Sequence, residues 1–199
     1  LNPLHTVAKQ IGETLLVHRG MTGRTAQNRI LELLELVGIQ HPQKRLKAYP
    51  HELSGGQRQR VMIAMALACE PELLIADEPT TALDVTVQRK ILLLLKQLQE
   101  RLNMSLLLIS HDLNLVHSIA QRVCVMRAGE IVEQSNCHSL FKQPQHPYSK
   151  LLLDAEPAGE PLPRDSREKV LVVDNLRVWF SLGGGIFRRH KEYLKAVDD

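Results

Sequence analysis

The sequence predicts an α/β fold in which helices pack on a mainly parallel sheet. Two short, largely apolar runs, Leu73–Ala76 and Ser105–Ser110, have the length and composition of strands. The stretch between them, Thr86–Leu102, repeats its apolar residues at helical spacing. A strand, a helix and a second strand in this order favour parallel pairing through a helical crossover. The run Leu73–Ala76 further predicts a strand that is buried on both faces.

The N-terminal part of the chain is predicted to be helical. Apolar residues recur at helical spacing over Val7–His18 and Thr25–Val37, and Gly20 and Gly38 follow as C-terminal caps. A third helix is expected over Ser54–Leu67. These helices form a segment of their own ahead of the sheet.

Beyond the second strand, the alternation of helix and strand continues. Leu113–Ala120 is predicted as a helix and Arg122–Met126 as a strand. Ala128-Gly129 indicates a tight hairpin turn into Glu130–Glu133. His138–Ala155 is expected to form short helices that are broken by prolines.

Composition excludes several classes of protein. The 199 residues are 44% hydrophobic, but the longest apolar runs fall far short of the roughly 18 residues of a membrane span. The formal net charge of +3 is spread among acidic residues, which indicates a solvated surface and no nucleic-acid partner. Three cysteines without Cys-x-x-Cys spacing suggest a reducing cytoplasm and no thiolate metal site. If a membrane is involved, another chain must cross it.

The start of the third predicted helix carries a candidate phosphate site. Ser54 and Gln57 have the spacing of a capping box. Gly55 and Gly56 leave the other amides of the first turn uncovered, and the positive end of a helix dipole attracts phosphate. Standing alone, this pattern would describe an ordinary helix cap.

Three further candidates follow the two predicted strands. Asp77 ends the first strand, where a carboxylate can hold Mg²⁺ through a water, and Glu78 comes next. His111 follows the second strand, so it is expected at the same rim of the sheet as Glu78. Taken singly, the acidic pair would be a solvated helix start and the histidine an ordinary rim residue.

Together these segments resemble the ABC-type ATPases. Leu53–Gln57 matches the signature motif of that family residue for residue, and Leu73–Asp77 resembles its Walker B strand. Glu78 follows, Thr81–Asp84 resembles the D-loop, and His111 resembles the switch histidine. The resemblance implies an ABC-type nucleotide-binding domain, which is P-loop NTPase-like and combines a helical subdomain with a parallel-sheet core.

The resemblance also implies cofactors and roles. ATP and Mg²⁺ are expected, with Asp77 as the metal ligand. Glu78 is expected as the general base or water-polarising group, and His111 as a contact to the γ-phosphate. Asp84 is expected to organise the contact with a partner ATPase domain. The signature residues would bind ATP that is held by the partner: Leu53, Ser54, Gly55, Gly56 and Gln57.

One expected element is absent from the sequence. No Gly-x-x-x-x-Gly-Lys-Ser/Thr loop occurs to hold phosphates. Leu1–Leu4 resembles the sequence that follows the family's Q-loop, so the N-terminal part of the domain is expected to be missing. The complete protein would then hydrolyse ATP, whereas this fragment alone would be inactive.

The C-terminal tail suggests a subgroup. Phe141–Leu153, with its Gln-His-Pro-Tyr-Ser segment, resembles the oligopeptide and dipeptide importer ATPases. The plain alternative is a helix broken by proline. The resemblance implies two membrane-spanning permease subunits, a periplasmic solute-binding protein that acts indirectly, and a peripheral location at the cytoplasmic face of the inner membrane. The expected solutes are peptides or peptide-like compounds such as microcins.

The resemblance to ABC-type ATPases also divides the chain into parts. Residues 1–135 are expected to be the C-terminal portion of a first ABC ATPase domain, with 1–70 as helical subdomain and signature helix and 71–135 as catalytic core. Residues 136–169 would be the importer-type tail and linker, and 170–199 the start of a second ABC ATPase domain. This division predicts a tandem protein.

Two alternatives remain open from the sequence. A soluble ABC ATPase that acts on nucleic acid or ribosomes would share the signature, Walker B and switch motifs. A non-catalytic interaction module would explain the lack of a phosphate loop. A phosphate loop and a glutamine loop encoded ahead of Leu1 would favour the enzyme.

Overall fold

The computed structural model describes residues 1–81, 83–155, 172–182 and 192–198. They belong to two compact units, Leu1–Glu156 and Pro157–Asp199, which are described separately. The helices of the first unit are α1 Val7–Arg19, α2 Gly23–Leu36, α3 Pro42–Arg45, the 3₁₀ turn η1 Pro50–Glu52, α4 Gly55–Leu67, α5 Val85–Leu102, α6 Leu113–Ile119, α7 Cys137–Lys142 and α8 Pro147–Asp154. Its strands are β1 Leu73–Asp77, β2 Ser105–Ile109, β3 Arg122–Arg127 and β4 Glu130–Asn136.

The predicted N-terminal helices are confirmed, with shifted ends. Helix α1 starts after Thr6, whose hydroxyl accepts the Lys9 amide, and its C-cap is Gly20, with a φ of 63°. Helix α2 ends at Leu36 with Val37 as its C-cap, and Gly38, predicted as the cap, follows with a φ of 72°. Both glycines take the left-handed conformation that allows a helix to stop.

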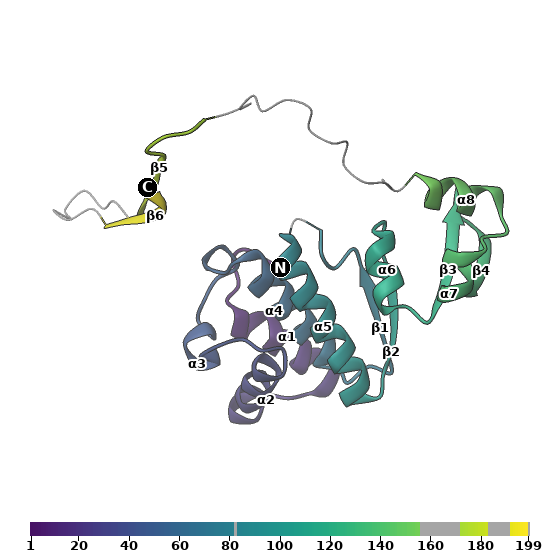
Figure 1. Ribbon diagram of the computed structural model, residues 1–199. Coiled ribbons are helices and arrows are strands. Elements are labelled where there is room, and N and C mark those ends of the chain that lie inside the picture. The colour runs from purple at the N-terminus through teal and green to yellow at the C-terminus, as the bar shows by residue number, and fades with distance from the viewer. Residues whose placement is uncertain (82, 156–171, 183–191, 199) are drawn as a thin grey trace. The chain divides into compact units, whose positions relative to one another are not determined.

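Helices α1, α2, α4 and α5 enclose the main core beside β1 and β2 (Figure 1). Their apolar faces follow the helical spacing of the sequence, and burial of each large side chain contributes roughly 1.5–3 kcal/mol. The largest fully buried side chains of this core are Ile11, Leu15, Leu33, Leu34, Leu67, Ile91, Leu95 and Leu98.

Strands β1 and β2 pair in parallel, as predicted, from Leu73 opposite Ser105 to Asp77 opposite Ile109. The expectation that β1 is buried on both faces is wrong for the described residues. Ile75 is 59% exposed and Leu107 of β2 is 48% exposed. Successive side chains of a strand point to opposite faces, and only one face of this sheet packs on the helical core.

Strand β3 does not extend the parallel sheet among the described residues. It pairs antiparallel with β4, and the predicted hairpin turn is confirmed at Ala128 and Gly129, with φ values of 51° and 86°. Positive φ at both central residues matches the turn type that suits strand twist. The register shifts between Val125 and Met126, which marks a β-bulge.

The tail helices are attached to this hairpin. The carboxylate of Glu133 in β4 accepts the amides of Gln145 and His146, each at 2.9 Å. The Arg127 guanidinium lies 4.9 Å from the centre of the Tyr148 ring. The hydrogen bond from Gln145 is the main reason that the pKa of Glu133 is lowered. The Gln-His-Pro-Tyr segment is therefore an anchored helix start, with Pro147 as its first residue.

The second unit contains an antiparallel pair, β5 Arg177–Leu182 and β6 Glu192–Asp198. The alternating apolar residues of Val170–Phe180 predict an edge strand. The structure has a strand only from Arg177 onwards, and residues 170–171 lie outside the described residues. Of the expected tail and linker, 136–169, residues 156–169 also lie outside them. No helix in the described part of the chain is long and apolar enough to cross a membrane.

Candidate functional site

Glu78 and His111 meet at the carboxyl ends of β1 and β2. The parallel register brings the strand ends together, and the Glu78 amide donates to the Ile109 carbonyl at 3.0 Å. Nδ1 of His111 lies 2.7 Å from Oε1 of Glu78, and the His111 backbone amide also donates to that oxygen at 3.2 Å. The predicted placement of both residues at one rim is confirmed.

The backbone at Glu78 is held in an unusual conformation. Its φ of 45° lies in the left-handed region, which residues with a Cβ adopt uncommonly. Thr81 stabilises the turn, because its hydroxyl donates to Glu78 Oε2 at 3.2 Å and its amide donates to the Glu78 carbonyl at 3.2 Å. A strained backbone conformation persists only where the surrounding contacts hold it in place. Such conformations are common at functional sites.

The two side chains remain accessible from solvent, and they shift one another's protonation. The His111 side chain is 82% exposed and that of Glu78 35% exposed. Hydrogen bonding to His111 lowers the pKa of Glu78, and hydrogen bonding to Glu78 raises the pKa of His111. The pair therefore favours a carboxylate facing an imidazolium on an open rim. Groups that approach from solvent can reach both.

Asp77 lies beside this pair as the last residue of β1, and it is exposed. The described residues contain no cluster of three or more histidine, cysteine or acidic side chains that could enclose a metal. Mg²⁺ is usually held by one or two carboxylates together with phosphate oxygens and waters. The single carboxylate of Asp77 fits that chemistry, whereas a metal site built only of protein groups does not fit.

The signature segment caps α4 as predicted. The Ser54 hydroxyl accepts the Gln57 amide at 3.3 Å, and the Gln57 side chain accepts the Ser54 amide at 3.0 Å. The first intrahelical bond joins the Arg58 amide to the Ser54 carbonyl. The amides of Gly55 and Gly56 belong to the helix end that attracts anions. Leu53, directly before this turn, is buried.

The two glycines have a packing role that the sequence did not suggest. A Cβ on Gly55 would lie 3.0 Å from Leu83 Cδ2, and one on Gly56 would lie 2.6 Å from Val87 Cγ1. Gly56 therefore abuts Val87 of α5 so closely that an added Cβ would force a shift, and Gly55 lies in tight contact with Leu83, just ahead of α5. The predicted D-loop residue Asp84 caps α5, where its carboxylate accepts the Val87 amide at 2.9 Å.

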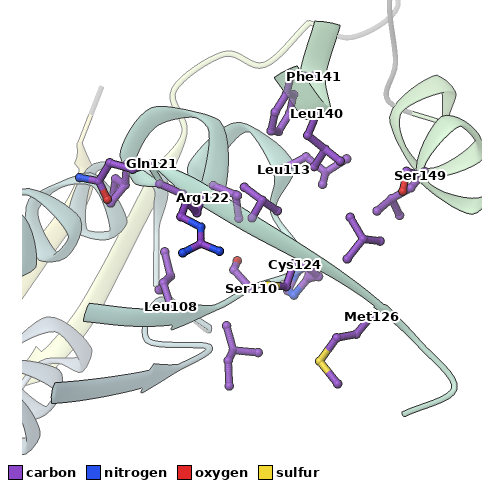
Figure 2. A pocket seen from close by; sticks show the side chains of 18 of the residues that line it. Leu108, Ser110, Leu113, Gln121, Arg122, Cys124, Met126, Leu140, Phe141 and Ser149 are labelled. Carbon is purple, nitrogen blue, oxygen red and sulfur yellow. The ribbon is translucent and has the colours of Figure 1, made fainter. Parts of the chain in front are cut away.

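An apolar cavity of about 460 Å³ opens beside His111, between β2, β3 and the helices α6 to α8. Figure 2 shows leucines such as Leu108 and Leu113 around it, together with Arg122 and Cys124 of β3. Among the described residues, β2 pairs only with β1 and β3 only with β4, so each strand has one open edge. The mainly apolar lining suits protein packing better than a triphosphate.

Comparison with known proteins agrees with this arrangement. The profile of the ABC transporter family matches residues 1–81. The peptidoglycan transport ATP-binding protein YejF of Agrobacterium fabrum is 58% identical over 199 residues, which is all of this chain and 36% of that protein. The dipeptide transport ATP-binding protein DppD of Haemophilus influenzae is 56% identical over 157 residues, covering 79% of this chain and 48% of that protein. The chain thus spans between a third and a half of these relatives.

A solved structure supports the fold. The ATP-binding cassette MJ0796, a dimer in a post-hydrolysis state bound to ADP and Pi, aligns with a TM-score of 0.59 at 34% identity. The alignment covers 69% of this chain and 59% of that chain. The chain therefore has the nucleotide-binding domain fold of an ABC ATPase. By sequence it is similar to the peptidoglycan transport ATP-binding protein YejF and the dipeptide transport ATP-binding protein DppD.

Proposed function

We propose that this chain supplies the Walker B, signature and switch residues of an ATPase that powers uptake of peptides or peptide-like solutes. The observation that carries the proposal is the pairing of Glu78 with His111 at the end of two parallel strands. Carboxyl ends of parallel strands are where such folds place their chemistry. The sequence similarity to the peptidoglycan transport protein YejF and the dipeptide transport protein DppD supports the choice of solute class.

In this proposal, Glu78 orients and polarises the water that attacks the γ-phosphate, and the solvent-accessible carboxylate of Glu78 accepts a proton from that water. His111 holds the carboxylate at 2.7 Å and presents its other ring nitrogen to the phosphate. Asp77 would hold Mg²⁺, which supplies charge neutralisation on the phosphate oxygens when bound. General acid–base groups of this kind contribute roughly 10²–10⁴-fold to rate.

The signature segment would act on a second nucleotide. Ser54, Gly55, Gly56 and Gln57 open α4 with amides and a hydroxyl suited to phosphate. The resemblance to ABC-type ATPases implies that their ligand would be nucleotide held by a partner domain. The dimeric state of the similar cassette MJ0796 supports such a partner, and Asp84 would lie at the shared boundary.

The phosphate-binding loop would come from a part of the complete protein that this chain does not contain. A phosphate loop joins a strand to a helix, and its strand would have to end near His111. We propose that this strand lies between the open edges of β2 and β3 and fills the apolar cavity there. The helix that the loop joins to this strand, and not the strand itself, would cover the exposed apolar face of the β1–β2 sheet.

The complete protein is proposed to be a tandem ATPase. The YejF relatives of Agrobacterium fabrum and Escherichia coli align with 100% and 99% of this chain, which is 36% and 37% of their own lengths. The DppD relative aligns with only 79%. Residues 170–199 would then begin a second ATPase domain, and 136–169 would join the two.

We also propose the transport setting. The ATPase would bind two permease subunits on separate chains, at the cytoplasmic face of the inner membrane, and a periplasmic binding protein would deliver the solute. The similarity to a peptidoglycan transport protein and a dipeptide transport protein supports solutes with peptide chemistry. They favour this setting over the alternative of a soluble ATPase that acts on nucleic acid or ribosomes.

The test is steady-state ATP hydrolysis by the complete protein and its Glu78→Gln variant. We expect at least about a 100-fold fall in kcat, because the amide keeps the shape but loses the basic oxygen. Glu100→Gln, an exposed site on α5, is the matched control and should retain the wild-type rate. Equal hydrolysis by all three proteins would contradict the assignment. A complete wild-type protein without ATPase activity would favour the non-catalytic module.

A further inference from the structure

Gln88, on the first turn of α5, joins the loops that carry Glu78 and His111. Its Nε2 donates to Thr80 Oγ1 at 3.2 Å and to Asp112 Oδ2 at 3.3 Å. Thr80 lies two residues beyond Glu78, and Asp112 directly follows His111. One side chain therefore connects the loop after β1 with the loop after β2.

The chemistry of these groups fixes how the amide is oriented. An ionised carboxylate only accepts hydrogen bonds, so the nitrogen of Gln88 must face Asp112. The two hydrogens on that nitrogen serve the two acceptors at once. A hydrophobic residue of similar size would leave the hydroxyl of Thr80, which is 7% exposed, without this donor.

The backbone under Gln88 is firmly held. The Gln88 amide donates to the Asp84 carbonyl at 2.8 Å, and the Asp84 carboxylate caps the turn. The neighbouring residue, Val87, is packed against Gly56 at the start of α4. Asp112 is also fixed, because its second oxygen accepts the Leu115 amide and caps α6. Gln88 thus bridges two anchored elements.

We propose that Gln88 is a positioning residue for ATP hydrolysis, which holds the Glu78 loop and the His111 loop at the separation that their pairing requires. The inference rests on the proposed function of those two residues. Gln88 is not one of the residues proposed to bind nucleotide or to hold the attacking water, and its side chain bonds to Thr80 and Asp112. Its loss would let the two loops move apart while the helices and strands remain folded.

The first experiment compares Gln88→Leu with Gln97→Leu in the complete ATPase. Gln97 is exposed on the same helix and serves as the matched control. We expect Gln88→Leu to lower kcat about tenfold while KM for ATP changes less than about threefold, since a displaced catalytic group affects chemistry more than binding. Gln97→Leu should match the wild type in both constants.

A second experiment reverses the polarity of the hydrogen bond. Gln88→Glu should lower kcat at least as much as Gln88→Leu, because two carboxylates would then face each other. Adding Asp112→Asn restores the hydrogen bond, because the asparagine amide donates and the carboxylate introduced at position 88 accepts. The asparagine oxygen still caps α6. We expect the double variant to recover kcat to within about threefold of the wild type, which a general loss of folding would not permit.

A third readout does not depend on activity. Hydrogen exchange in the nucleotide-free complete protein should accelerate in Gln88→Leu at peptides covering 76–84 and 108–116, and should stay unchanged in Gln97→Leu. If the wild type hydrolyses ATP and Gln88→Leu keeps both its kcat and its exchange rates, the inference is wrong. If the wild type lacks ATPase activity but exchange accelerates, the connection between the loops stands and the proposed function fails.

Discussion

Nδ1 of His111 lies 2.7 Å from Oε1 of Glu78, across 33 residues of sequence. The contact exists because two parallel strands end at the same edge of the sheet. It links a carboxylate on a left-handed backbone to an imidazole that is exposed to solvent. Because of this contact, the protonation of His111 depends directly on whether the Glu78 carboxylate is present and charged.

The pKa of His111 should fall toward its ordinary value when Glu78 is replaced by Gln. Glu78 is the main cause of the raised pKa, and Asp112 adds a smaller electrostatic effect. With a raised pKa, the stabilising pair is fully formed below pH 6.5 and is lost as pH rises through the higher, folded-state value. NMR titration of histidine ring signals in the nucleotide-free protein measures this, with Glu100→Gln as control. An unchanged His111 titration in Glu78→Gln would show that the pairing does not persist in solution.

Gly56→Ala should destabilise the domain by about 1–3 kcal/mol, because the added Cβ would lie 2.6 Å from Val87. Gly12→Ala is the matched change within α1, where the nearest atom is 3.6 Å away. That substitution should stabilise by about 0.5–1 kcal/mol through helix propensity. The midpoints of denaturant-induced unfolding distinguish the Gly56→Ala variant from the Gly12→Ala variant. Val87→Ala should partly restore the Gly56→Ala variant, and a failure to do so would argue against the contact.

Glu133→Gln should loosen the start of α8. The carboxylate accepts the Gln145 and His146 amides, and its lowered pKa means that this contribution is present above pH 4.5 and is lost as pH falls through the lower, folded-state value. At neutral pH we expect about threefold to tenfold faster exchange of those two amides, as the charge-assisted bonds weaken. Glu130→Gln, on the same strand, should leave them protected. If the two amides exchange at the same rate in the wild type, Glu133→Gln and Glu130→Gln, Glu133 does not anchor the start of α8.

Cys124 offers a test of the proposed strand between β2 and β3. The thiol is exposed in this chain and lies on the cavity, whereas Cys137 is buried. In the complete, folded protein we expect Cys124 to react with maleimide at least about tenfold more slowly than an exposed thiol, similar to Cys137. Rapid labelling of Cys124 alone would mean that the cavity remains open.

The elements that the sequence predicted best are those with strong local signals. Helices α1 and α5 follow the apolar period, the Ala128-Gly129 turn forms a hairpin, and the Ser54–Gln57 capping box is present. The shared rim of Glu78 and His111 followed from strand order alone. Each of these depends on a few neighbouring residues or on one pairing rule.

The contacts that the sequence could not predict are those between distant elements. Gln88 is a neutral residue on a polar helix face, and no local pattern marks its bonds to Thr80 and Asp112. The close approach of Gly56 to Val87 depends on how α4 and α5 cross. The sequence predicted burial of both faces of β1, because an apolar strand suits burial on both faces. Its composition does not identify what covers each face, so the uncovered face was not predicted.

The most direct test of the central claim is the identity of the nucleotide that the complete Glu78→Gln protein retains. After incubation with ATP and Mg²⁺ and removal of free nucleotide, the bound nucleotide is separated and quantified beside that of the wild type. If Glu78 drives hydrolysis at the site shared with His111, the variant retains intact ATP and the wild type retains ADP or none. Recovery of ADP from the variant at the wild-type rate would contradict the account.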